Sequence, residues 1–372
     1  MEVTVRCAAL SSNTACMQDI VQSLAPAIGI LAPGWPDAAT PGSRAEESGR
    51  EVNLPLMTGA VLEIVVFAVV IAAAYGLVYW AHRALRGDRS AYVGLYLLFG
   101  LPGGLLTIAG AALLANGMSG GWLALALGLG LGLPLLKPFR VAVARVTPMD
   151  PGSPVDFSGL AVILALMGYL VYTLVVLDPG DADEGETVIT SGSAITSLII
   201  NVMAFVALAY VAVGYRISRS GREATERLGL RMPGLQEIGV GLAAVVPAFV
   251  FSIGASLLTQ WLQPEYVDQL EETMSEMLTG VDNPLGALVL GLSTGVGEEV
   301  LFRGAIQPRY GIVLASVFWS LLHVQYDLTW VVAGIFAMGV MLGLLRKYYG
   351  TTAAIITHAV YNALIVLIQS AL

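Results

Sequence analysis

Long apolar runs constrain this chain more than any other feature of its sequence. From Leu56 to the C-terminus about ten apolar stretches follow one another, most of them near the roughly twenty residues that a helix needs to cross a bilayer. Only helices and closed barrels satisfy every backbone hydrogen bond in lipid, and these stretches are continuous rather than alternating. The sequence therefore predicts an all-α polytopic transmembrane helical bundle.

The composition agrees with this prediction. The chain has 372 residues, of which 56% are hydrophobic and 12% are charged, whereas soluble domains carry about 25% charged residues. We expect a multi-pass integral membrane protein of the cell (plasma) membrane, with lipid as a partner and no nucleic acid. The expected spans are Leu56–Tyr79, Tyr92–Ala115, Gly121–Leu136, Phe157–Leu177, Ile195–Tyr215, Leu235–Leu258, Leu285–Ile306, Gly311–Val324, Thr329–Leu345 and Thr352–Leu372.

The charges between these spans predict the orientation. Excess Lys and Arg mark cytoplasmic loops, and here the basic residues follow the odd-numbered spans, most densely between residues 216 and 231. The even-numbered loops are acidic where they are long, at residues 178–186 and 265–282. Both termini are therefore expected outside the cytoplasm.

Three regions are expected along the chain. Residues 1–54 are predicted to be a poorly ordered N-terminal tail, and Met57 is an alternative start. Residues 55–232 would form the N-terminal transmembrane helices, and residues 233–372 a C-terminal helical bundle with its core at about 285–372. Glycine-rich residues 128–132 are interpreted as a close helix contact. Cys7 and Cys16 lie in the tail, so thiol catalysis is not expected.

The candidate chemistry begins with two adjacent acids, Glu298 and Glu299, inside the seventh span. An ionisable side chain at membrane depth is costly unless it faces a partner or a wet cavity, so it indicates a functional site. Glu299 and Arg303 are four residues apart and can pair on one helix face. Successive helical residues point about 100° apart, so Glu298 is left to face elsewhere.

Two of the three histidines lie downstream of these acids, within the last spans. His358 shares a helix face with Asn362, four residues on, and His323 shares one with Trp319, four residues before it. The third, His82, is expected at the cytoplasmic interface beside Arg83. The intramembrane acids and histidines together predict one site built by separate helices.

These residues form three motifs in order: EExxxR at residues 298–303, an aromatic residue four before His323, and HxxxN at residues 358–362. The pattern resembles the CPBP family, the CAAX proteases and bacteriocin-processing enzymes, also called type II CAAX prenyl endopeptidases. The matching region begins at about Leu285. Trp319 stands where that family usually has Phe, a departure that concerns the shape of the cavity more than its chemistry.

The resemblance implies an intramembrane endopeptidase whose cavity opens to the cytoplasm. Glu298 would act as general base on a water held with His323, and His358 and Asn362 would bind the oxyanion. Glu299 and Arg303 would support Glu298, with Trp319 as a wall. The substrate would be a membrane-associated peptide or protein, prenylated in the CAAX case, that arrives from the membrane or the cytoplasmic side. No cofactor is required in this mechanism.

Alternatives use some of the same residues. Glu298, His323 and His358 could instead hold Zn²⁺, with Glu299 as the base of a metalloprotease. Gly291 to Gly295 fits GxSxG, but a nucleophile elbow needs a strand-to-helix turn, so Ser293 is expected to be a decoy. An ion or proton-coupled transporter would scatter ionisable residues over several spans, which this chain does not do. A family member that works by binding alone is the remaining alternative.

Overall fold

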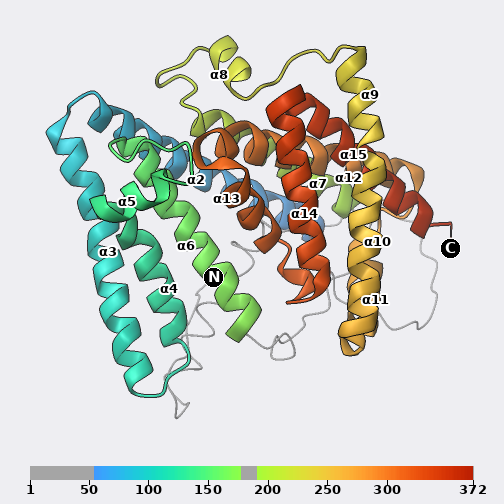
Figure 1. The fold of residues 1–372 in the computed structure, drawn as a ribbon, viewed down its shortest axis with the longest axis horizontal. Coiled ribbons are helices and arrows are strands. Elements are labelled where there is room, and N and C mark those ends of the chain that lie inside the picture. Colours follow the sequence, from blue (N-terminus) through green and yellow to red (C-terminus); the bar gives the residue numbers. More distant parts are fainter. Residues whose placement is uncertain (1–53, 177–190, 372) are drawn as a thin grey trace.

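The computed structural model describes residues 54–176 and 191–371, and these contain helices and no β-strand (Figure 1). The N-terminal half comprises α2 (Leu54–Leu85), α3 (Arg89–Ala115), α4 (Gly121–Gly132), α5 (Lys137–Ala144), α6 (Pro154–Val176), α7 (Ser191–Ala212) and α8 (Gly221–Arg227). The C-terminal half comprises α9 (Leu235–Ala243), α10 (Val245–Leu262), α11 (Val267–Leu278), α12 (Pro284–Glu298), the π-helical segment η4 (Glu299–Ile306), α13 (Gln307–Leu321), α14 (Trp330–Tyr349) and α15 (Thr351–Gln369). The remaining helical elements of the described residues are three short 3₁₀ turns: η1 (Leu133–Leu135), η3 (Pro264–Tyr266) and η5 (Val324–Tyr326). The predicted tail and the acidic loop at residues 178–186 lie outside the described residues.

The all-α polytopic bundle is confirmed, and the spans differ from the expected ten at two places. Eight helices among the described residues are long and apolar enough to cross a membrane, or nine if a bent pair counts as one span. The third expected span, Gly121–Leu136, is the first helix of that pair, and the chain turns by 85° between it and Lys137–Ala144. The seventh and eighth expected spans form one 38-residue stretch, Pro284–Leu321.

Gly311 breaks that stretch. Its φ is +84° and its ψ is 168°, a backbone conformation that is essentially restricted to glycine. The chain therefore changes direction between η4 and the rest of α13. This local break allows residues from both expected spans to contribute to one site.

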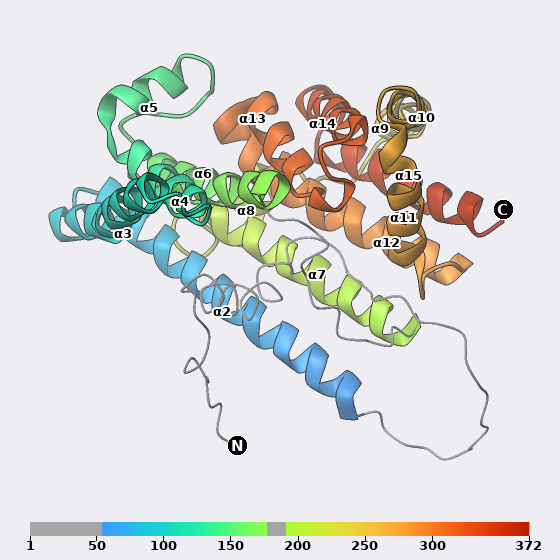
Figure 2. The same cartoon turned by 90° about the horizontal axis from the view of Figure 1, so that it is seen from below.

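Glycines bring several helices into close contact, as the sequence predicted for residues 128–132. A Cβ at Gly128 would lie 2.4 Å from the backbone nitrogen of Thr107 on α3, and one at Gly130 would lie 2.6 Å from that of Ala165 on α6. Such small residues let helix backbones approach each other in a membrane. They join α3, α4 and α6 at one side of the molecule, and α2 runs beside α7 toward the other (Figure 2).

The largest core cluster lies in the C-terminal half, where α13, α14 and α15 meet α6 and α10. It includes fully buried Phe302, Trp319 and Leu342. A smaller cluster joins α7 and α8 to the π-helical segment through Leu228 and Val300. The candidate site therefore lies within the best packed part of the bundle.

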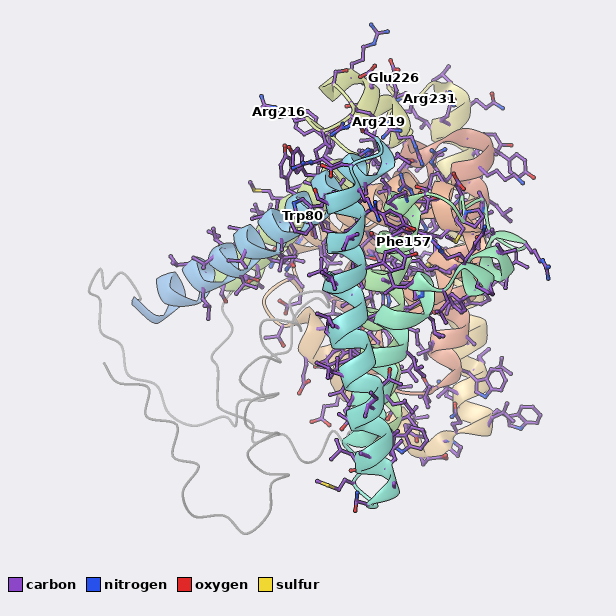
Figure 3. The ribbon with its side chains drawn as sticks, turned by 90° about the vertical axis from the view of Figure 1, so that its left-hand side faces the viewer. Trp80, Phe157, Arg216, Arg219, Glu226 and Arg231 are labelled. Atoms are coloured by element: carbon purple, nitrogen blue, oxygen red, sulfur yellow. The ribbon has the colours of Figure 1, made fainter. Side chains whose placement is uncertain are left out.

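The two ends of the bundle differ in charge. We name the end with α8 the arginine end, because Arg216, Arg219 and Arg231 lie there together, beyond Trp80 and Phe157 (Figure 3). Helix α11 lies near the opposite end, at the bottom of Figure 1, and carries Asp268, Glu271, Glu272 and Glu276. We name this the acidic end.

Candidate active site

The two predicted acids lie where α12 passes into the π-helical segment. The Asn283 side chain caps α12 by accepting the Gly286 N–H at 2.9 Å, and Pro284 occupies the first turn. After Glu298 the chain takes π-helical turns through Ile306. π-Helical turns are rare in proteins as a whole, and those that occur are often found at functional sites. Both glutamates are buried, Glu299 completely.

Small residues bring α15 close to these acids. A Cβ at Gly291 would lie 2.4 Å from the carbonyl oxygen of Ala359, and one at Gly295 would lie 2.8 Å from the Ala359 backbone nitrogen. Larger residues at these two positions would push the helices apart. The contact places His358 beside Glu299, although 59 residues separate them in the sequence.

Glu299 has two partners, Arg303 and His358. Its Oε1 accepts Arg303 Nη1–H at 3.0 Å and lies 2.9 Å from His358 Nδ1. The predicted Glu299–Arg303 pair is thus present, with both side chains almost fully buried. Arg303 also donates to the Gly339 carbonyl at 3.3 Å and stacks over the Trp319 ring at 4.4 Å. Glu299 does not line the large cavity that Glu298 faces.

Glu298 has a different partner. The indole Nε1–H of Trp319 donates to Glu298 Oε2 at 2.5 Å. Trp319 also contacts the rings of His323 and His358 edge-on, with centroid distances of 5.0 and 5.6 Å. The sequence predicted this tryptophan only as a wall. Unlike Phe, Trp carries a ring N–H donor, so its presence at a motif position that usually holds Phe was the available signal.

The two histidines each use Nδ1 for support. His323 Nδ1 lies 3.0 Å from the Trp319 carbonyl oxygen, and His358 Nδ1 lies 2.9 Å from Glu299 Oε1. Both partner oxygens can only accept a hydrogen bond. When the ring is neutral, its proton therefore lies on Nδ1, which donates to that oxygen. In each histidine, Nε2 is then left as the atom for chemistry. A neutral Nε2 accepts a hydrogen bond, and a protonated one donates.

Asn362 is held by a residue that the motifs did not include. Its Nδ2 donates to Thr294 Oγ1 at 2.8 Å, and Thr294 in turn donates to the Leu290 carbonyl at 2.7 Å. Thr294 thereby fixes the orientation of the Asn362 amide. No sequence spacing indicated this contact, because it crosses from α12 to α15.

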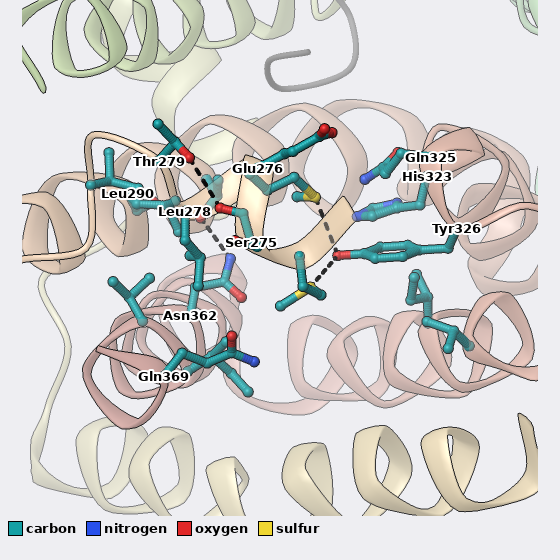
Figure 4. A pocket seen from close by; sticks show the side chains of 18 of the residues that line it. Ser275, Glu276, Leu278, Thr279, Leu290, His323, Gln325, Tyr326, Asn362 and Gln369 are labelled. Atoms are coloured by element: carbon teal, nitrogen blue, oxygen red, sulfur yellow. Dashed lines mark hydrogen bonds between the residues drawn. The ribbon is translucent and has the colours of Figure 1, made fainter. Parts of the chain in front are cut away.

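One cavity brings the four predicted catalytic side chains together. It has a volume of about 1630 Å³ and is lined by Glu298, His323, His358 and Asn362 as well as by Trp319. Figure 4 shows His323, Tyr326 and Asn362 around part of this space. Tyr326 Oη donates to the sulfur atoms of Met274 and Met277, at 3.4 and 3.7 Å, so α11 borders the cavity.

The cavity lies beside α11, which carries the charges of the acidic end. Its lining includes residues of α11, the first turns of α2 and α7 and the last turn of α15, and none of the α8 arginines. The family resemblance implies a cavity open to the cytoplasm, whereas the basic loops predict that the acidic end lies outside. Both stay predictions, and the lining of the cavity by α11 and by no residue of α8 is easier to reconcile with access from the acidic end.

The proposed zinc set does not fit a metal site. Among residues 54–176 and 191–371, no three His, Cys, Asp or Glu side chains are grouped so that they could hold a metal ion. In addition, Trp319 occupies one oxygen of Glu298, and Glu299 is shielded from the cavity. We therefore derive no step through a metal.

Two other predicted residues lie outside the site. Ser293 sits within α12, where its hydroxyl donates to the Leu290 carbonyl at 3.2 Å, so its GxSxG motif forms no nucleophile elbow. His82 lies in the last turn of α2 beside Arg83, as expected, and is buried there, with its Nε2 3.4 Å from Ser218 Oγ of the loop before α8.

The comparison with known families agrees with this geometry. Residues 280–364 match the family model described as Type II CAAX prenyl endopeptidase Rce1-like. This segment is an Rce1-like domain. It contains every motif residue from Glu298 to Asn362 and confirms the resemblance found in the sequence. No curated protein and no solved structure matched the chain.

Proposed function

We propose that the Rce1-like domain is an intramembrane endopeptidase that hydrolyses a peptide bond with a water activated by Glu298. The observation that carries the proposal is the single cavity lined by Glu298, His323, His358 and Asn362. An ionisable cluster buried among membrane helices needs a function that offsets its cost. The family match supports hydrolysis over transport.

In the proposed reaction, Glu298 and His323 Nε2 hold a water against the substrate carbonyl. Glu298 takes a proton from this water as the water oxygen bonds to the carbonyl carbon, and a tetrahedral oxyanion forms. When the C–N bond breaks, that proton passes to the leaving nitrogen. A carboxylic acid and an amine are the products, and Glu298 returns to its starting form.

His358 and Asn362 stabilise the oxyanion in this proposal. In this proposal Glu299 Oε1 holds the His358 ring at Nδ1, 2.9 Å away, and the ring donates its Nε2–H to the oxyanion as an imidazolium. Thr294 orients the Asn362 amide by accepting the hydrogen bond from its Nδ2. Preorganised donors of this kind typically contribute about 3 to 4 kcal/mol each to lowering the barrier.

The cavity suggests the class of substrate. Its volume exceeds the roughly 300 to 1,000 Å³ that is usual for small-molecule sites. Met274, Met277 and Met338 contribute flexible apolar surface. An extended peptide segment with bulky apolar groups, including a prenylated one, fits these properties better than a small polar ligand.

The test is a comparison of membrane peptides from cells that carry the wild type, Glu298→Gln or Ser293→Ala. We expect Glu298→Gln to reduce turnover by about 10² to 10⁴-fold, since general-base catalysis contributes that much. Its uncleaved substrate should accumulate, whereas Ser293→Ala should give the wild-type peptide pattern. A wild-type pattern with Glu298→Gln in folded, membrane-inserted protein would refute the proposal.

A further inference from the structure

The arginine end holds four guanidinium groups that the protease mechanism does not use. They belong to Arg219, which precedes α8, Arg227 in its last turn, Arg309 near the start of α13 and Arg346 at the end of α14. Segments far apart in the sequence thus bring cations to one place. The charges of Arg309, Arg219 and Arg346 all act on Arg227, and the carboxylate of Asp156 opposes them more weakly.

Contacts with glycines locate two of these groups. A Cβ at Gly229, two residues after Arg227, would lie 2.8 Å from the central guanidinium carbon of Arg346. Gly229 has a φ of +72°, so the turn itself favours glycine there. A Cβ at Gly214 would lie 3.6 Å from Arg219 Nη1. The turns on either side of α8 thus lie directly against Arg219 and Arg346.

Of these four arginines, only Arg309 forms an ion pair with a carboxylate among the described residues. Arg309 Nη1 pairs with Asp156 Oδ1 at 3.0 Å. Arg219 donates to the Val213 carbonyl, and Arg346 Nε donates to the Arg303 carbonyl at 3.2 Å. Within the described part of the chain, neither has a carboxylate partner, and Arg227 has neither an ion pair nor a hydrogen bond.

Burial and the repulsion from neighbouring arginines make the charged form of Arg227 unfavourable. Burial, together with the charges of Arg309, Arg219 and Arg346, lowers the pKa of Arg227 to about 10. The guanidinium is still protonated at neutral pH. Like charges gathered in a partly buried place repel each other, and an anion that enters among them removes this repulsion.

We infer that Arg219, Arg227, Arg309 and Arg346 form a binding site for a phosphate group, supplied by an anionic lipid headgroup or by free phosphate. Guanidinium groups bind phosphate oxygens through two parallel hydrogen bonds, which suits Arg227 because all its donors are available. Basic pockets between helices on the cytoplasmic side of membranes bind such headgroups. This inference does not depend on the proposed protease activity.

The experiment measures thermal unfolding of the purified full-length protein in neutral detergent. The three ligands are dioctanoyl phosphatidic acid, dioctanoyl phosphatidylcholine and inorganic phosphate. We expect a saturable rise in Tm with phosphatidic acid and none with phosphatidylcholine, which has the same chains and no net charge. Competition by inorganic phosphate at similar concentrations would identify the free anion as a sufficient ligand, and its failure would identify the lipid headgroup.

Two matched variants make the test specific. Arg227→Gln should weaken binding about tenfold or more, because a hydrogen bond to a charged group is lost together with the charge. Arg222→Gln removes the same charge from the same helix, but Arg222 is exposed and paired with Glu226 at 2.8 Å. It should bind like the wild type.

Two further readouts separate binding from folding. Arg227→Gln without ligand should unfold at or above the wild-type Tm, since it removes a repelled charge. Arg227→Lys keeps the charge without the planar fork and should bind with intermediate affinity. Equal weakening by Arg222→Gln, or no saturable effect of any phosphate, would overturn the site.

Discussion

The arginine end and the interior of the bundle each hold an Arg–Glu pair four residues apart on one helix, in opposite surroundings. Arg222 and Glu226 on α8 pair at 2.8 Å with side chains that are 89% and 62% exposed. Glu299 and Arg303 pair at 3.0 Å with side chains that are 0% and 1% exposed. The same local spacing thus produces a surface contact in one place and the support of a site in the other.

The difference extends to the two ends of the bundle. At the arginine end the guanidinium groups of Arg219 and Arg346 bond to backbone carbonyls, and the cavity does not reach α8. At the acidic end α11 borders a large space that leads to Glu298. The cavity that holds the proposed site is thus lined from the acidic helix α11 and not from α8.

The largest expected effect is an all-or-none difference in labelling between the two ends. In a chain with Cys7 and Cys16 replaced by Ser, Ser275→Cys on α11 and Arg222→Cys on α8 provide single reactive thiols. Because excess arginine marks the cytoplasmic face, we expect Ser275→Cys to react with a membrane-impermeant maleimide on intact cells. Arg222→Cys should react only after the cells are permeabilised.

The opposite labelling pattern would be equally informative. It would place the acidic end in the cytoplasm, as the family resemblance implies, and would show that the arginines do not set the orientation of this bundle. The catalytic proposal would survive that outcome, because it depends on the cavity and not on the compartment. Substrates would then have to be sought on the cytoplasmic side.

The next largest effect concerns the two ion pairs. Glu299→Gln leaves Arg303 buried beside a neutral partner, and breaking a buried pair in this way typically costs about 3 to 5 kcal/mol of folding free energy. It also removes the carboxylate that supports His358. Unfolding in mixed SDS micelles measures the stability, and turnover of the Glu298-dependent peptides measures the activity.

Glu226→Gln is the matched control for that experiment. It makes the same chemical change in a pair of the same spacing, but at the exposed arginine end, where water solvates the remaining charge. We expect no measurable loss of stability or of activity. Similar losses in both variants would mean that burial does not distinguish the two pairs.

These comparisons show which contacts a sequence can predict. The Glu299–Arg303 pair follows from helical spacing alone, because both residues lie within about one turn. The His358–Glu299 contact could be predicted only as a member of a family motif. Its geometry depends on Gly291 and Gly295, which allow α15 to approach.

The spans show the same limit. Hydropathy located nearly all the apolar helices, but it read residues 285–306 and 311–324 as separate spans. The structure shows one stretch that breaks at Gly311. Hydropathy also could not show at which end a cavity forms, because that depends on how α7, α11, α12 and α15 surround it. The orientation and the direction of access were thus predicted from independent signals, the basic loops and the family resemblance, and both stay predictions.

The smallest effect tests the contact that the sequence least anticipated, between Trp319 and Glu298. Trp319→Phe keeps an aromatic ring against His323 and His358 but removes the N–H that donates to Glu298 Oε2 at 2.5 Å. A hydrogen bond to a charged group contributes about 1.5 to 3 kcal/mol, so we expect kcat to fall about tenfold to a hundredfold. KM should change little, since the indole N–H contacts the carboxylate rather than the substrate.

The matched control for this substitution is Trp330→Phe. Trp330 is 42% exposed at the start of α14 and does not line the cavity. Wild-type turnover in this control would show that losing a tryptophan is not itself harmful. The resemblance, in which this motif position usually holds Phe, predicts that catalysis can proceed without the indole. A complete loss of turnover in Trp319→Phe would contradict that prediction and mean that this chain depends on the indole contact to position its base. Unchanged turnover would mean that the α12–α15 scaffold positions Glu298 without Trp319.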